Sequence, residues 1–84
     1  MGHITLMTPR VETVDGIKIN VYFNDHNPPH FHAAQGADEA LISIRDLVVV
    51  KGSIPSTKTV LAWAAANRET LIAAWNRCNP DKPY

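Results

Sequence analysis

One stretch decides the fold of this chain: Val11-Glu12-Thr13-Val14-Asp15-Gly16-Ile17-Lys18-Ile19-Asn20-Val21-Tyr22-Phe23-Asn24. An Asp-Gly pair between two runs of β-favouring residues predicts a hairpin closed by a type I′ turn. In the second run the apolar side chains share one face of a strand, and the other face is polar; the apolar set is Ile17, Ile19, Val21 and Phe23. This alternation is typical of an antiparallel sheet with one face in water.

The segment that follows continues the same pattern. His30 to Gln35 can form a strand that turns at Gly36-Ala37-Asp38 into a second strand from Glu39 to Ile44. A β-branched run, Leu47 to Val50, then ends the sheet before Gly52. We therefore expect an antiparallel β-meander of four to five strands over residues 10–51, approximately.

The periodicity changes to that of helix after Ser53, a candidate N-cap, with Pro55 in the first turn. One helical stripe and its flanks are apolar: Val60, Ala64, Leu71 and Trp75, flanked by Leu61, Trp63 and Ile72. A continuous helix from Pro55 to Cys78 would be about 36 Å long, whereas a domain of this size is about 30 Å across. We therefore predict one or two helices over residues 54–78, favouring two that break near Asn67, and a frayed tail at 79–84.

These elements indicate an α+β fold in which the C-terminal helices pack on one face of the sheet. With 84 residues the chain is expected to be a single domain, residues 1–84. The single cysteine, Cys78, allows no internal disulfide and no cysteine-based zinc site. A formal net charge of zero disfavours binding to a nucleic-acid backbone. The opening segment, Met1 to Met7, does not resemble a secretory signal, and no apolar run is long enough to span a membrane, so we expect a cytoplasmic protein.

Three of the four histidines lie close together in the stretch from Asn24 to Ala33. If Phe31 packs inward, His30 and His32 both point to the opposite, uncovered face, with Cα atoms roughly 6.5 to 7 Å apart. This geometry suits a transition metal such as zinc, with His26 as the third ligand. An extended Asn27-Pro28-Pro29 arm would hold His26 about 12 Å from His30. A cis X-Pro bond could fold the arm back, or Asp25 or Glu39 could replace His26 as the ligand.

Other interpretations of this stretch remain open. His30 and His32 could be catalytic without a metal, as a general acid and base near neutral pH, with Tyr22, Lys18 or Arg45 steadying a phosphate. The histidines could instead only hydrogen-bond the backbone of a proline-rich loop. The same loop could also be a rigid binding surface for another protein; its residues are Asp25, His26, Pro28, Pro29 and Phe31.

The run from Val21 to Ala33, together with Glu39 to Ile44, Gly52 to Pro55 and the helical region from Trp63 to Trp75, resembles the small bacterial domain-of-unknown-function family 4160. The resemblance extends from about Val14 to Trp75. The signature of the family corresponds to seven residues here, without assigning a role to any of them: Asp25, His26, Pro28, Pro29, His30, Phe31 and His32.

The resemblance implies a short stand-alone bacterial protein encoded beside a second small protein, in an arrangement like a toxin–antitoxin pair. That second protein is the expected partner, and part of the apolar helical stripe could alternatively form a homodimer. The leading functional hypothesis is therefore a protein-interaction component of a two-gene module. The alternative hypothesis is a small His-dependent hydrolase or ribonuclease, with or without a bound metal.

Overall fold

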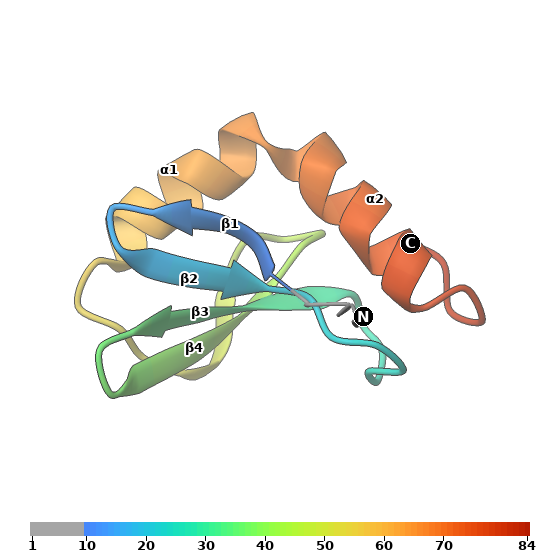
Figure 1. Cartoon of the computed structure of the whole chain (residues 1–84), viewed down its shortest axis with the longest axis horizontal. Helices are drawn as coiled ribbons and strands as arrows, with labels where there is room; N and C mark the ends of the chain where they lie inside the picture. The colour runs from blue at the N-terminus through green and yellow to red at the C-terminus, as the bar shows by residue number, and fades with distance from the viewer. Residues whose placement is uncertain (1–9) are drawn as a thin grey trace, which may run out of the picture.

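Five strands form one antiparallel sheet in the computed structural model, which describes residues 10–84 (Figure 1). The strands are β1 (Arg10–Val14), β2 (Ile17–Asn20), β3 (His30–Gln35), β4 (Asp38–Ser43) and β5 (Val49–Gly52). Their order in the sheet is their order in the sequence, and each neighbouring pair is antiparallel. The predicted β-meander is therefore confirmed, with five strands. The opening segment that was judged not to be a secretory signal lies outside the described residues.

The hairpin between β1 and β2 turns where the sequence predicts. Asp15 has φ 49° and Gly16 has φ 81°, and a type I′ turn needs positive φ at both positions. The second strand is shorter than predicted, because it ends at Asn20. Asn24 then adopts φ 54° and its N–H donates to the carbonyl oxygen of Cys78. Phe23, predicted to face inward, lies in the resulting loop with 45% of its surface exposed.

Two helices, α1 (Thr57–Ala66) and α2 (Arg68–Cys78), lie across the same face of the sheet (Figure 1). The predicted break at Asn67 is confirmed; the Asn67 side chain donates to the carbonyl oxygen of Trp63. The helix begins later than predicted, with Ser56 rather than Ser53 at the N-cap position. The backbone N–H of Ser56 donates to the side-chain oxygen of Gln35, at the end of β3. Within residues 10–84, neither helix is long and apolar enough to cross a membrane.

The core lies between the helices and one face of the sheet. The predicted stripe of Val60, Ala64, Leu71 and Trp75 is fully buried. The sheet meets it with eight buried side chains: Ile17, Ile19, Val21, Phe31, Ala33, Ala40, Ile42 and Ile44. Because side chains alternate along a strand, His30 and His32 leave β3 on the side away from Phe31. At the end of the strand the His30 ring still reaches Trp75 of α2.

Residues 79–84, predicted as a frayed tail, are hydrogen-bonded to the rest of the molecule. Asn79 is buried, and the indole N–H of Trp75 donates to the carbonyl oxygen of Lys82 at 2.6 Å. The N–H of Tyr84 donates to the side-chain oxygen of Asn76 at 2.7 Å. Pro80 and Pro83 lie beyond the end of α2 and have no N–H to donate. The tail is held instead through the carbonyl oxygen of Lys82 and the N–H of Tyr84.

Candidate metal centre

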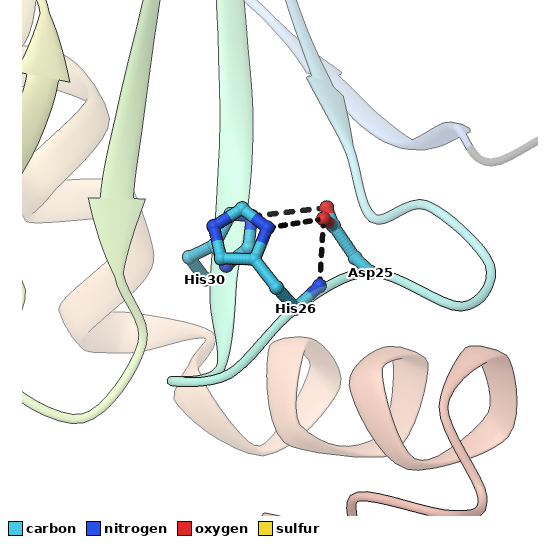
Figure 2. A group of neighbouring side chains, drawn as sticks. All are labelled: Asp25, His26 and His30. Carbon is cyan, nitrogen blue, oxygen red and sulfur yellow. Dashed lines mark hydrogen bonds and ion pairs between the residues drawn. The ribbon is translucent and has the colours of Figure 1, made fainter.

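The loop between β2 and β3, residues 21–29, folds back so that Asp25 and His26 lie beside His30, the first residue of β3 (Figure 2). The Asn27–Pro28 peptide bond is cis, and the ring centroids of His26 and His30 are 4.9 Å apart. The expectation of an extended arm that separates these two imidazoles is therefore wrong. The folded-back arm with a cis X-Pro bond is the arrangement found.

The carboxylate of Asp25 is surrounded by three imidazoles. Its Oδ1 lies 3.0 Å from His26 Nδ1, and its Oδ2 lies 2.9 Å from His30 Nε2 and 3.3 Å from His32 Nε2. Burial by itself would raise the pKa of Asp25. The hydrogen bond from the His26 backbone N–H and the three imidazoles outweigh this effect and lower the pKa of Asp25 below its usual value. Asp25 is therefore ionised at neutral pH and can act as a ligand.

His30 is buried, contrary to the expectation of an uncovered face. Its side chain is 3% exposed, because the folded-back loop covers it and Trp75 lies against it with ring centroids 5.5 Å apart. Its Nδ1 lies 2.9 Å from the carbonyl oxygen of Pro28. A carbonyl oxygen can only accept, so Nδ1 carries the proton and donates it. In the neutral ring Nε2 then presents a lone pair.

His30 Nε2 lies beside the carboxylate without forming a hydrogen bond. Among the described residues, His30 Nε2 is the one buried side-chain nitrogen or oxygen atom without a hydrogen-bond partner. Its 2.9 Å approach to Asp25 Oδ2 lacks hydrogen-bond geometry. Two electron-rich atoms at this distance repel each other unless a proton or a metal ion lies close to both.

His32 lies two residues further along β3, and both of its ring nitrogens lie near carboxylate oxygens. Its Nδ1 lies 3.2 Å from Oε2 of the half-exposed Glu39, and its Nε2 approaches Asp25. A carboxylate also only accepts, so each contact requires His32 to donate, from Nδ1 to Glu39 and from Nε2 to Asp25, and a neutral ring can donate only one of the two hydrogen bonds at a time. The ring of Tyr22 packs edge-on against His32 with centroids 4.5 Å apart. Tyr22 and Glu39 therefore fix the orientation of the His32 ring.

Asp25, His26 and His30 form a group that could hold a metal ion. One potential ligand atom from each lies within 4.8 Å of the other two. Ligands on a tetrahedral zinc ion, with bonds of about 2.0–2.1 Å, lie roughly 3.4 Å from one another. The group is wider than this, so it would have to close around an ion, and His26 is its exposed member. The group contains two of the three predicted metal ligands, and Asp25 takes the place of His32.

The other residues singled out from the sequence are spread around this centre. Pro28 accepts the hydrogen bond from His30, while the carbonyl of Pro29 accepts one from the N–H of Ile44. Phe31, predicted as a binding residue, is fully buried in the core on the opposite face of β3 and does not reach the centre.

Asn79 is a supporting residue that the sequence did not reveal. Its side-chain oxygen accepts a 2.6 Å hydrogen bond from the Asp25 N–H, and its side-chain nitrogen donates to the carbonyl oxygen of Tyr22 at 3.1 Å. Asn79 therefore anchors both ends of the segment that presents Asp25. An asparagine just beyond a helix gives no signal of a contact 54 residues away.

Comparison with known proteins identifies the family but no closer relative. Neither the curated proteins nor the solved structures gave a match. One family model matches residues 16–76, which includes every residue of the centre except the supporting Asn79. Its description is "Domain of unknown function (DUF4160)". The match covers well over half of the chain, and the chain therefore belongs to the DUF4160 family.

Proposed function

We propose that this protein is a small metal-dependent hydrolase in which Asp25, His26 and His30 hold a divalent transition metal, with zinc the best fit. The observation that carries the proposal is the buried Nε2 of His30, which has no hydrogen-bond partner although a carboxylate oxygen of Asp25 lies 2.9 Å away. Two imidazole nitrogens and one carboxylate oxygen are a ligand set of catalytic zinc sites. Such sites leave a fourth position for water.

Protonation is the competing explanation of this geometry. One extra proton on His30 would turn the 2.9 Å contact into an ion pair. His26 and His32 can approach the same carboxylate as neutral N–H donors. A divalent ion would instead bind Asp25 and the lone pair of His30 together. The two explanations differ in metal content, which the following experiment measures.

His32 supplies the acid–base step in this proposal. A bound zinc ion lowers the pKa of its water towards neutrality. Nε2 of His32 contacts Asp25 without the metal; with Asp25 bound to the metal and Glu39 accepting from Nδ1, Nε2 would be released to take a proton from that water and return it to a leaving group. This arrangement follows the logic of a carboxylate–histidine pair in hydrolases. Tyr22 acts by keeping the His32 ring in place.

The test separates metal binding from catalysis. Tag-free protein is loaded with zinc, dialysed and assayed for bound metal by elemental analysis and by calorimetric titration. We expect the wild type to bind about one equivalent of zinc. Asp25→Asn and His30→Gln should each lower the zinc affinity by at least about tenfold. His32→Gln should keep the metal but lose hydrolysis by about 100-fold or more.

Asp46→Asn, which removes a carboxylate away from the centre, is the matched control and should bind zinc as the wild type does. Less than about a tenth of an equivalent in the wild type would exclude the metal centre. Equal zinc affinity in wild type, Asp25→Asn and His30→Gln would exclude these ligands.

A second candidate function is the binding of another small protein, as a component of a two-gene toxin–antitoxin-like module. The observation that favours it is the exposure of three consecutive valines, Val48, Val49 and Val50, at the edge of the sheet formed by β5. An exposed apolar edge strand is a site where a partner can add a strand. Such an edge suits the neighbouring protein that the family resemblance implies.

This candidate is tested by growth of a bacterial host after induction of the wild type, His30→Ala and His32→Ala, with the neighbouring gene absent and expression verified for each. Growth arrest by the wild type alone would support a toxin acting through the histidines. Equal growth of the three strains would argue against a toxin acting through the histidines and would favour partner binding. Co-expression with the neighbouring protein should then give a complex that Val50→Lys weakens and Lys58→Glu, on exposed α1, does not.

A further inference from the structure

A hollow of about 130 Å³ lies directly beside the candidate metal centre. Its walls are His26, Pro28, His30, Leu41, Ser43 and Val50. Leu41 and Ser43 belong to β4, where they are the cross-strand partners of His32 and His30. They therefore share the face of the sheet that carries the imidazoles. Because His26 and His30 line the hollow, a molecule in it would lie beside the metal centre.

The walls of the hollow are mostly apolar. Leu41, Val50 and the Pro28 ring supply hydrocarbon surface, and no lysine or arginine is among the residues that line it within the described part of the chain. A cavity of about 150 Å³ with hydrocarbon walls is large enough for benzene. This hollow is slightly smaller, so it suits an aliphatic group of about three to five carbons.

Arg45 belongs to a different hollow. Arg45 lines a separate, more open depression of about 410 Å³ together with Asn27, Pro28, Pro29 and Pro83. Its guanidinium carbon lies 4.9 Å from the centre of the Tyr84 ring. The metal ion would offset part of the charge of a phosphodiester at the centre, but the hollow beside it, with Leu41 and Val50, offers no second cation. Phosphoryl-transfer sites usually surround the phosphoryl group with several cations, from arginine, lysine or further metal ions.

We infer that the substrate of this centre is a short-chain acyl ester or amide, with its acyl chain in the hollow of Leu41 and Val50 and its carbonyl group at the metal. This inference rests on the proposed metal-dependent hydrolysis and chooses among its substrates. It disfavours the ribonuclease form of the hypothesis. Ser43, whose hydroxyl oxygen accepts from the Asp46 N–H, can donate its own proton towards the carbonyl oxygen.

The reaction of an ester is balanced by water alone. The water oxygen forms a bond to the acyl carbon, and the bond from that carbon to the ester oxygen breaks. His32 takes a proton from the water and delivers it to the departing alcohol oxygen. The products are a carboxylic acid and an alcohol, and nothing is oxidised or reduced.

The test compares three chromogenic substrates with the zinc-loaded protein: 4-nitrophenyl acetate, 4-nitrophenyl butyrate and bis(4-nitrophenyl) phosphate. Each rate is divided by the rate in buffer with free zinc, because the esters are intrinsically more reactive. We expect the butyrate acceleration to exceed that of the phosphodiester by at least about 100-fold, in line with the discrimination that a fitted pocket provides.

Variants of the hollow locate the acyl chain. Val50→Trp should fill the hollow and lower kcat/KM for the butyrate by about tenfold or more, while changing the acetate value by less than about threefold. Val50→Leu should have an intermediate effect. Val48→Trp, two residues away and outside the hollow, is the control and should leave both esters unaffected. Zinc affinity should be the same in all of these variants.

Each contrary result has a definite meaning. A larger acceleration for the phosphodiester, or equal effects of Val50→Trp and Val48→Trp, would overturn the acyl assignment. Zinc binding without cleavage of either ester would also overturn it, while leaving the metal centre intact. Failure of the wild type to bind zinc would instead remove the proposed function itself.

Discussion

At the residue scale, His30 and His32 have different surroundings although they lie two positions apart on β3. His30 is almost completely buried between Trp75 and the folded-back loop, whereas His32 lies nearer the solvent beside half-exposed Glu39. Removing the His30 ring would leave a cavity and an unpaired Pro28 carbonyl. Removing the His32 ring would leave groups that water can reach. The two positions are therefore not equivalent in stability.

We predict that His30→Ala lowers the free energy of unfolding by about 2–4 kcal/mol, and His32→Ala by about 1 kcal/mol or less. Urea denaturation of tag-free protein in the presence of a chelator measures both values, so that bound metal does not contribute. Similar decreases in the free energy of unfolding for the two variants would show that the burial of His30 does not determine its contribution to stability.

Cys78 should be a slow nucleophile in the folded protein. Its thiol is 6% exposed and lies 3.7 Å from the carbonyl oxygen of Val21. Burial raises the pKa of the Cys78 thiol, with Arg77 opposing this only in part, so less thiolate exists at neutral pH than in the unfolded chain. We expect disulfide reagents to label native protein at least about 100-fold more slowly than urea-unfolded protein at pH 7.5. Equal labelling rates would contradict this burial.

At the element scale, the junction of β4 and β5 depends on a glycine. Gly52 has φ 75°, and a Cβ atom there would collide with the backbone oxygen of Glu39. Gly36 also has a positive φ, of 62°, but a Cβ atom there would meet open space. The two glycines therefore separate the cost of the backbone conformation from the cost of the collision.

We expect Gly36→Ala to lower the free energy of unfolding by about 1 kcal/mol, and Gly52→Ala to lower it by about 3 kcal/mol or more. Chemical denaturation of the two variants under one set of conditions provides the comparison. Because Gly52 pairs with β4 next to Glu39, the change should also disturb the carboxylate that orients His32. Equal destabilisation of the two variants would mean that β4 and β5 can separate at Gly52 without a cost in free energy.

The end of α2 positions the loop that presents Asp25. Asn79 holds the backbone of Asp25 and of Tyr22 through its buried side chain, although it contacts no metal ligand atom itself. We predict that Asn79→Ala lowers zinc affinity by about 10–100-fold, which is the usual effect of losing a group that supports a ligand. Asn76→Ala in the same helix is the control, and calorimetric titration is the measurement. Unchanged affinity in Asn79→Ala would show that the loop holds its shape without this anchor.

At the scale of the whole molecule, a metal ion bound to the folded state alone must stabilise it. A ligand at 100 times its dissociation constant adds about 2.7 kcal/mol. For a domain of 84 residues each kcal/mol corresponds to about 4–8 °C in Tm. We therefore expect zinc to raise Tm by about 10–20 °C and a chelator to reverse the change. A shift of the same size in Asp25→Asn would mean that the zinc is bound elsewhere.

The parts of this molecule that sequence predicts are those governed by near neighbours. The Asp15-Gly16 turn, the meander and the helix break at Asn67 each follow from a local pattern of residues. The early end of β2, the burial of His30 and the anchoring by Asn79 depend on contacts between distant segments, such as the 54-residue separation of Asp25 and Asn79. Local patterns contain no information on those contacts. The sequence therefore indicated where the histidines lie, but not that Asp25 would be their common neighbour.

The hydrogen bonds of Asn79 also bear on the order in which the protein acquires its properties. All the strand pairs join neighbours in sequence, but the buried face of the sheet is covered only when both helices have been made. The loop with Asp25 gains its hydrogen bond to Asn79 last, because Asn79 lies near the end of the chain. Chains that stop before Asn79 would lack this anchor, so the centre would reach its full metal affinity only in molecules whose translation has passed Asn79.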